Sequence, residues 1–290
     1  MLAIRRTVSI STDFTCRLVG RRRVVRAARF VLWRARHDGR NDMRTNGERS
    51  LQKWAMSLAP PGEIVNVVDV GANKGQWSIA MLTTAERAGR IADLRLHAFE
   101  PSLYTFGLLS EVLSNRRAYL YREALSDVPG SAILHVVAPA AGTNSLYCVP
   151  DLPIEAATEE VTTTTLDSFA RRAGMGRLTL VKIDAEGHDI VVLRGARRLF
   201  AEQRISVVQF EYNHRWIHGR FFLRDAFEML EPLGYRIGKL TPRGVEFYPG
   251  WDPELETFIE NNYVACLEAI AEKLPSVSWW KVPPARKRFR

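Results

Sequence analysis

The stretch VVDVGANKGQWS, residues 67–78, decides the fold of this 290-residue chain. Its β-branched residues before Gly71 predict a buried central strand. Gly71 and Gly75 predict a tight turn where the backbone comes close to a ligand, and Trp77 to Met81 begins a helix. Free backbone N–H groups and the helix dipole favour negative groups at such a turn. The stretch therefore predicts a site for a nucleotide-like ligand.

The rest of the chain alternates in the same way between apolar strands and amphipathic helices. An antiparallel pair over 235–240 and 245–248 closes the order, and residues 252–273 are predicted to be helical. This alternation predicts a doubly wound α/β fold with a mostly parallel sheet. The other strands are expected at 93–99, 118–125, 132–137, 178–183 and 205–210, and the main helices at 50–58, 106–113, 167–172, 189–200 and 222–233.

Polar residues follow the predicted strands where each one ends. In a doubly wound sheet the ligand binds beyond the carboxyl ends of the strands, so these residues are the candidate site. They are Gly71, Asn73 and Gly75 after the first strand, Glu100 after the second, Ser126 and Asp127 after the third, Asp184 and Glu186 after the strand at 178–183, and Glu211, Asn213 and His214 after the strand at 205–210.

The glycine spacing and Asp69 favour S-adenosylmethionine over a dinucleotide as the ligand, whereas both ligands have a ribose that Glu100 could hold. The glycine spacing is one residue short of the dinucleotide pattern G-x-G-x-x-G. Asp69 would repel a pyrophosphate but favour an ammonium or sulfonium group. Glu100 could hold a ribose diol, and Asp127 could accept from the adenine amino group. The predicted cofactor-binding residues are Asp69, Gly71, Ala72, Asn73, Gly75, Glu100, Ser126, Asp127 and Asp184.

Several motifs in one order resemble the FkbM family of S-adenosylmethionine-dependent methyltransferases. The resemblance implies a class I, Rossmann-like methyltransferase fold, with a seven-stranded, mostly parallel sheet and an antiparallel last strand. It also implies methyl transfer, usually to a hydroxyl of a sugar, glycolipid or polyketide product. A non-catalytic binding module and a nicotinamide-dependent oxidoreductase are the alternatives. The matching motifs are VDVGANKG at 68–75, AFEP at 98–101, ALSD at 124–127, TLDSF at 165–169, VKIDAEG at 181–187 and VQFEY at 208–212.

Asp184, Glu211 and His214 are the candidate catalytic residues. An alcohol is a weak nucleophile at neutral pH, so its methylation needs a base or a metal. In one version His214 or a carboxylate is the general base. In the other, Asp184 and Glu211 bind a divalent cation such as Mg²⁺ through oxygen, and the cation acidifies the hydroxyl.

The positive charge of the chain lies at its two ends. Residues 1–50 hold 13 arginines against four acidic residues, which accounts for the whole net charge of +9. The pI of 9.7 is therefore a property of the termini, and nucleic acid is not an expected partner of the core. The predicted domains are a basic N-terminal extension (1–50), a methyltransferase domain (51–250), and a C-terminal helix with a basic tail packed on or flanking that domain (251–290).

The N-terminal extension predicts a peripheral membrane contact. Residues 16–36 form a predicted helix with Val24, Ala28, Val31 and Ala35 on one stripe and arginines on another, as in helices that lie on anionic membranes. A helix packed on the domain and a transit peptide are the alternatives. The chain has three distant cysteines and no apolar run of membrane-spanning length, so we expect a cytoplasmic protein, at most peripheral at the inner membrane face. The expected partner is a small-molecule or glycolipid acceptor, and the sequence leaves the oligomeric state open.

Overall fold

The computed structural model describes residues 2–39, 41–147 and 157–278. They divide into two compact units, Met1–Arg40 and Asn41–Arg290. The boundary therefore lies ten residues before the predicted one. The first unit contains α1 (Leu2–Val19) and α2 (Arg21–Arg36), separated by Gly20. Helix thus extends over residues for which the sequence predicted no element. The basic residues at 281–290 lie outside the described residues.

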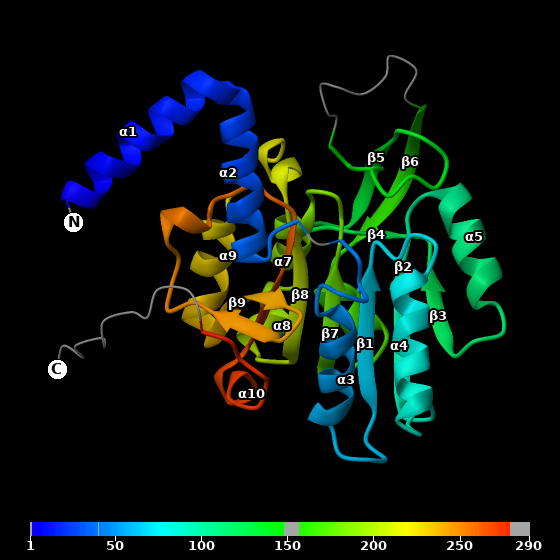
Figure 1. Ribbon diagram of the computed structural model, residues 1–290. Helices are drawn as coiled ribbons and strands as arrows, with labels where there is room; N and C mark the ends of the chain where they lie inside the picture. Colours follow the sequence, from blue (N-terminus) through cyan, green and yellow to red (C-terminus); the bar gives the residue numbers. More distant parts are fainter. Residues whose placement is uncertain (1, 40, 148–156, 279–290) are drawn as a thin grey trace. The chain divides into compact units, whose positions relative to one another are not determined.

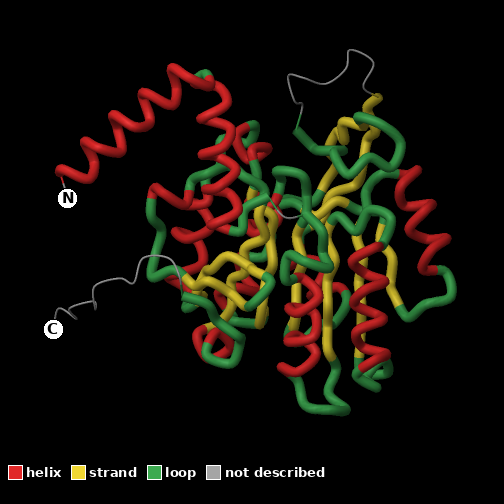
Figure 2. Tube along the Cα trace, in the orientation of Figure 1, coloured by secondary structure: helices red, strands yellow, loops and turns green. Residues whose placement is uncertain are grey.

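The large unit is built on an eight-stranded sheet in the order β10-β9-β11-β8-β7-β1-β2-β3. Strands β3, β2, β1, β7, β8 and β9 are parallel to one another, and β10 and β11 run antiparallel to them. Figure 2 shows these strands, in yellow, side by side in the large unit. The bounds are β1 (Val65–Val70), β2 (Leu94–Phe99), β3 (Ala118–Tyr121), β7 (Leu178–Ile183), β8 (Ile205–Tyr212), β9 (Tyr235–Thr241), β10 (Gly244–Phe247) and β11 (Asn261–Leu267).

Helices cover both faces of this sheet, because successive side chains of a strand point to opposite faces. Val67 of β1 packs in a core with α3 and α4, whereas its neighbour Val68 packs in a core with α6 to α9. In Figure 1, α3 and α4 lie over β7, β1 and β2. The predicted doubly wound α/β fold is confirmed. The helices are α3 (Glu48–Leu58), α4 (Gln76–Arg87), α5 (Leu103–Leu113), α6 (Leu166–Arg172), α7 (Asp189–Arg194), α8 (Arg197–Ala201), α9 (Leu223–Leu230) and α10 (Glu268–Ala271), with short turns η1 (His214–Ile217), η2 (Glu231–Leu233) and η3 (Pro253–Leu255).

The C-terminal segment is a strand, not the predicted helix. Strand β11 lies between β8 and β9 and is antiparallel to both. The connection from β8 to β9 leaves a gap one strand wide, and a strand in that gap satisfies the backbone groups on both sides. Residues 261–267 (NNYVACL) are also mostly weak helix formers, so their own propensity agrees with the strand and not with the helix predicted over 252–273. This segment is therefore an antiparallel strand inside the sheet, between β8 and β9, and does not flank the domain.

A second, three-stranded sheet branches from the carboxyl ends of the parallel strands. It contains β4 (Ala124–Leu125), β6 (Ala157–Thr164) and β5 (Gly130–Val136), in that order. The single strand predicted over 118–125 is thus divided between two sheets. Helix α6 begins after Thr165, whose hydroxyl accepts from Ser168 N at 3.0 Å. Asp167, in the first turn of α6, accepts from the backbone N–H groups of Arg198 and Leu199 in α8.

Candidate cofactor and acceptor site

The glycine turn after β1 is held between the ends of two neighbouring strands. Ala72 N donates to Phe99 O of β2 at 2.9 Å, and Asp184 N donates to Val70 O at 3.1 Å. Gly71 has φ +71°, and a Cβ built there would lie 1.9 Å from Asp184 O. Only glycine allows this backbone conformation and this approach together. The turn thus brings residues from β1, β2 and β7 to one point.

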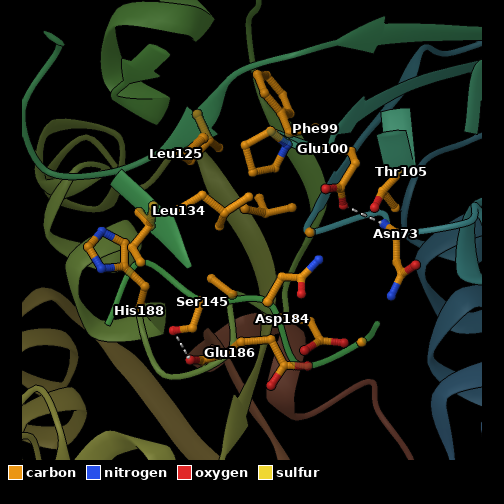
Figure 3. A pocket seen from close by; sticks show the side chains of 18 of the residues that line it. Asn73, Phe99, Glu100, Thr105, Leu125, Leu134, Ser145, Asp184, Glu186 and His188 are labelled. Carbon is orange, nitrogen blue, oxygen red and sulfur yellow. Dashed lines mark hydrogen bonds between the residues drawn. The ribbon is translucent and has the colours of Figure 1, made fainter. Parts of the chain in front are cut away.

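A cavity, which we call the cofactor cavity, opens at that point, beyond the carboxyl ends of the strands (Figure 3). Its apolar part is formed by Phe99, Leu125 and Leu134, and its polar part by side chains that follow the strands. An apolar slot with a few polar groups is typical of small-molecule sites. Of the predicted cofactor-binding residues, Gly71, Asn73, Glu100 and Asp184 line it. Other residues that line the cavity were not predicted as cofactor-binding. They include the three apolar residues just named, together with Ala141, Gly142, Leu146, Ala185 and His188.

Glu100 has a carboxylate suited to a ribose diol. Its two oxygens accept from Asn73 N at 3.0 Å and from Ser102 N at 3.1 Å. These bonds fix the carboxylate at the cavity wall (Figure 3). Burial raises the pKa of Glu100 to about 7, although the hydrogen bonds from the two backbone N–H groups act in the opposite direction.

Asn73 presents an unused acceptor to the same cavity. Its backbone is left-handed, with φ +48°, a conformation that asparagine tolerates better than most residues. Its side-chain Oδ1 is buried and has no hydrogen-bond partner among the described residues. A buried acceptor without a partner costs free energy. An ammonium or hydroxyl donor of a bound cofactor would remove that cost, so this side of the cavity also fits S-adenosylmethionine.

We expect the affinity for S-adenosylmethionine to fall below pH 7. The ionised carboxylate of Glu100 is the form that accepts from two hydroxyls, and below its pKa of about 7 the group becomes neutral. The dissociation constant should therefore rise as the pH falls, approaching roughly tenfold per unit. Calorimetric titration from about pH 8.5 to pH 5.5 measures this. Glu100→Gln should bind weakly and without pH dependence, and a constant affinity in the unmodified chain would contradict the assignment.

Asp69 lies behind the turn, outside the cavity. Its carboxylate is fully buried, accepts from Ser78 Oγ at 2.7 Å and pairs with Lys182 Nζ at 3.3 Å. The register of β1 and β7 sets Asp69 opposite Lys182. Lys182 also pairs with Asp184 at 3.3 Å. Asp69 therefore fits a structural role, holding Lys182 between two strands, better than the predicted contact with the methionine ammonium.

The Lys182→Met variant should be strongly destabilised. Burial alone would lower the pKa of Lys182, but Asp184, Asp69 and Glu48 raise it overall, so the ammonium stays charged. Removing it leaves Asp69 as a buried charge, at a cost of about 3–5 kcal/mol in the free energy of unfolding. Urea denaturation measures this cost. The double variant Lys182→Met/Asp69→Asn should recover part of it, and a loss below about 1 kcal/mol in the single variant would show that the pair is not needed.

The remaining predicted cofactor residues lie around the cavity without lining it. Gly75 precedes α4 with φ +78°, and Ala72 lines a second cavity described below. Ser126 Oγ lies 3.1 Å from His188 Nε2. His188 does line the cofactor cavity, and burial lowers its pKa to about 4, so it is neutral. Asp127 lines a separate surface hollow and not this cavity, and its contact with the adenine amino group stays a prediction.

The second cavity, which we call the acidic cavity, adjoins the cofactor cavity at the glycine turn. It shares Gly71, Asn73, Asp184 and Glu186 with the cofactor cavity, and it has a volume of about 250 Å³. Its wall combines one lysine with several carboxylates and amides. The lining residues are Asn41, Met43, Asn46, Glu48, Gly71, Ala72, Asn73, Gln76, Trp77, Lys182, Asp184, Glu186, Glu211, Glu260 and Asn262.

Glu211 and Glu260 form a carboxyl pair in this acidic cavity. Burial, then the charges of Asp184 and Glu260, raise the pKa of Glu211 well above its usual range, and Glu260 is also its hydrogen-bond partner. The side chain of Glu211 also accepts from Asn213 Nδ2 at 2.5 Å. The sequence analysis missed Glu260 because it directly precedes β11, in the segment predicted as helix. Burial likewise raises the pKa of Glu48, which accepts from Gln209 Nε2 at 2.6 Å.

His214 is not brought to either cavity. It begins the turn η1, is exposed, and is absent from the residues that line the cofactor cavity and the acidic cavity. The neighbouring Arg215 instead reaches the site, where it pairs with Glu186. The predicted general base is therefore better sought among the carboxylates.

The carboxylates do not present a ready metal site. Within the described ranges, no three Asp, Glu, His or Cys side chains are arranged to hold a metal ion. The carboxylate of Asp184 is occupied by Lys182, which leaves Glu211 and its partner Glu260 as a pair. Mg²⁺ needs near-octahedral oxygen coordination, so we derive no step of the reaction through it.

The doubly wound sheet, with a glycine turn and two adjoining cavities at its carboxyl edge, fits the class I S-adenosylmethionine-dependent methyltransferases. The family model described as methyltransferase FkbM domain matches residues 69–237, and the chain belongs to this family. The resemblance predicted from the motifs is thereby confirmed.

Solved structures similar to this chain include three methyltransferase structures. Precorrin-6y C5,15-methyltransferase from Geobacter metallireducens is 13% identical, with 76% of this chain and 87% of that chain covered and a TM-score of 0.37. A TehB-like S-adenosylmethionine-dependent methyltransferase from Corynebacterium glutamicum is 11% identical, with 83% and 96% covered and a TM-score of 0.35. Fibrillarin from Aeropyrum pernix with bound S-adenosylmethionine is 11% identical, with 74% of each chain covered and a TM-score of 0.37. No curated protein matches the chain significantly.

Proposed function

We propose that the protein transfers the methyl group of S-adenosylmethionine to a hydroxyl of a sugar, glycolipid or polyketide-type acceptor. The observation that carries this proposal is the acidic cavity, which meets the cofactor cavity at Gly71, Asn73 and Asp184. Its carboxylates and amides offer many hydrogen-bond acceptors and donors at close range. Such a wall suits an acceptor with several hydroxyl groups better than an apolar ring or a polyanion.

Glu211 is the candidate base in the acidic cavity. S-adenosylmethionine supplies an electrophilic methyl group on a positively charged sulfur. The hydroxyl oxygen attacks the methyl carbon, so a C–O bond forms, the S–C bond breaks and S-adenosylhomocysteine leaves. The hydroxyl proton passes to Glu211. Its raised pKa makes Glu211 a stronger proton acceptor, and the positive charge of the cofactor nearby would favour its ionised form.

The Mg²⁺-dependent version remains open to a direct test. It predicts that a chelator abolishes turnover and that Mg²⁺ restores it, whereas the carboxylate version predicts unchanged turnover. The non-catalytic alternative predicts binding of S-adenosylmethionine with no methyl transfer at all. The family match supports methyl transfer over the nicotinamide-dependent oxidoreductase.

The experiment that tests the proposed function follows the methyl group to its product. The full chain is incubated with S-adenosylmethionine labelled in the methyl group and with a cell extract, and the labelled product is isolated. We expect a methyl ether, which resists mild alkali, on a compound with several hydroxyls. A methyl ester, an N-methyl product or a C-methyl product would overturn the proposal of O-methylation, and no label transfer would support the binding module.

A further inference from the structure

The N-terminal unit has an exposed surface that is both basic and apolar, on α1 and α2. We propose that this surface lies on an anionic lipid bilayer and holds the protein at the membrane. The proposal goes beyond methyl transfer, because it concerns the location of the protein and not its reaction. It commits to one partner on the basis of charge and of the apolar residues that accompany the charge.

The charge of the protein is concentrated in this unit. Residues 1–40 hold 11 arginines and 2 aspartates, which gives +9, and the whole chain is also +9, so residues 41–290 sum to zero. Helix α2 alone, RRRVVRAARFVLWRAR, has seven arginines and no acidic residue. Each basic residue near an anionic bilayer contributes about 1 kcal/mol of attraction. An acidic surface is therefore the natural complement of this helix.

Most aliphatic residues of α2 lie on one side of the helix. At 100° per residue, Val24, Val25, Val31 and Leu32 fall within one arc together with the alanines at 28 and 35. All the arginines of α2 except Arg21 lie outside this arc, and the exposed Phe30 lies among them. Val25, Val31 and Leu32 are 48%, 64% and 53% exposed. Trp33 lies among the arginines, beneath the guanidinium of Arg29 at 4.9 Å. Tryptophan is enriched at the level of lipid headgroups.

Helix α1 adds a second exposed apolar surface. Val8, Ile10, Phe14 and Leu18 are 58%, 62%, 62% and 69% exposed. Exposed apolar groups of this size commonly mark an interaction surface. None of the described helices is long and apolar enough to cross a bilayer, so the fitting mode of contact is a helix lying in the interface, with its apolar arc in the acyl boundary.

Other occupants fit this surface less well. A nucleic acid would use the arginines but would leave the apolar arc in water. A second copy of the chain could cover the apolar arc, but it would bring two sets of arginines together, and like charges repel. An anionic bilayer satisfies both arcs at once, because the headgroups pair with arginine while the acyl chains take the apolar side chains.

Vesicle sedimentation of the full chain tests the proposal. We expect binding to vesicles of phosphatidylcholine mixed with phosphatidylglycerol, and little binding to phosphatidylcholine alone. The triple variant Arg22→Gln/Arg26→Gln/Arg29→Gln should bind the anionic vesicles roughly 100-fold more weakly. The double variant Val31→Asp/Leu32→Asp should lose more than roughly tenfold. Both variants should keep their affinity for S-adenosylmethionine, because the changes lie outside the methyltransferase unit.

A matched control comes from exposed arginines of the large unit. The variant Arg116→Gln/Arg117→Gln/Arg122→Gln removes the same charge and should bind vesicles like the unmodified chain. Absence of binding to anionic vesicles would overturn the proposal. A loss with the arginine variant but none with the apolar variant would assign the surface to a general polyanion such as nucleic acid. A dimer, detected by light scattering, that the apolar variant dissociates while vesicle binding is absent would assign it to a second copy. Each result is independent of whether methyl transfer is observed.

Discussion

Gly71→Ala is expected to lower the free energy of unfolding by about 3–5 kcal/mol and to weaken S-adenosylmethionine binding by at least roughly 100-fold. The new Cβ would lie 1.9 Å from Asp184 O, and the residue would keep a positive φ. Neither the end of β1 nor the end of β7 can move away without breaking the hydrogen bond from Asp184 N to Val70 O. The displaced turn would carry Asn73 with it, out of the cavity wall where we predict that it meets the cofactor. Urea denaturation and calorimetric titration measure the two effects.

Gly89→Ala separates the close approach from the backbone conformation. Gly89 has φ +67°, nearly the same as Gly71, but a Cβ there would meet nothing within 4 Å. This variant should cost only about 1–2 kcal/mol for the left-handed conformation, and it should bind S-adenosylmethionine normally. If the two variants lose the same stability, the contact with Asp184 O does not constrain the turn.

Glu211→Gln is expected to lower kcat by about 10²–10⁴-fold, because the amide cannot accept the hydroxyl proton. The affinity for S-adenosylmethionine should change by less than about threefold, since Glu211 lines the acidic cavity and not the cofactor cavity. Single-turnover transfer of labelled methyl measures the rate. Glu246→Gln is the matched control, because Glu246 is a buried glutamate of the same sheet that lines neither cavity. Unchanged turnover in Glu211→Gln would assign the base elsewhere.

The carboxyl pair also predicts a direction for the pH profile. Asp184 and Glu260 both raise the pKa of Glu211, after burial itself. A base acts in its ionised form, so the acidic limb of the rate profile reports its pKa. Glu260→Gln removes one opposing charge, lowers the pKa of Glu211 and should shift that limb to lower pH. A shift to higher pH would contradict the pairing.

The sequence predicted best the elements that are buried on both faces. The mostly apolar runs before Gly71 and before Asp184 end where the strands end, because a buried parallel strand needs mainly apolar residues on both of its faces. Glu100 was recognised for the same reason, since it is the first acidic residue after such a strand.

Long-range pairing could not be predicted from local pattern. Residues 261–267 lie inside the window 252–273 that was predicted to be helical, and their pairing in the gap between β8 and β9 could not be seen from that window. Its register places Asn262 opposite Glu211, so the partnership of Glu211 with Glu260 depends on that unpredicted strand. Asp69 was predicted to touch the cofactor because its partner, Lys182, is 113 residues away in the sequence and opposite it in the sheet.

The position of β11 has a consequence for how the protein is made. Strand β11 fills the gap between β8 and β9, which are synthesised earlier. Domains begin to fold during synthesis, from the N-terminal side. The glycine turn and the ends of β1, β2 and β7 can therefore assemble on the ribosome, while the pairing edges of β8 and β9 wait for residues 261–267 to emerge. The cofactor side of the enzyme can form first, and the acidic cavity, which Glu260 and Asn262 help to line, closes only afterwards.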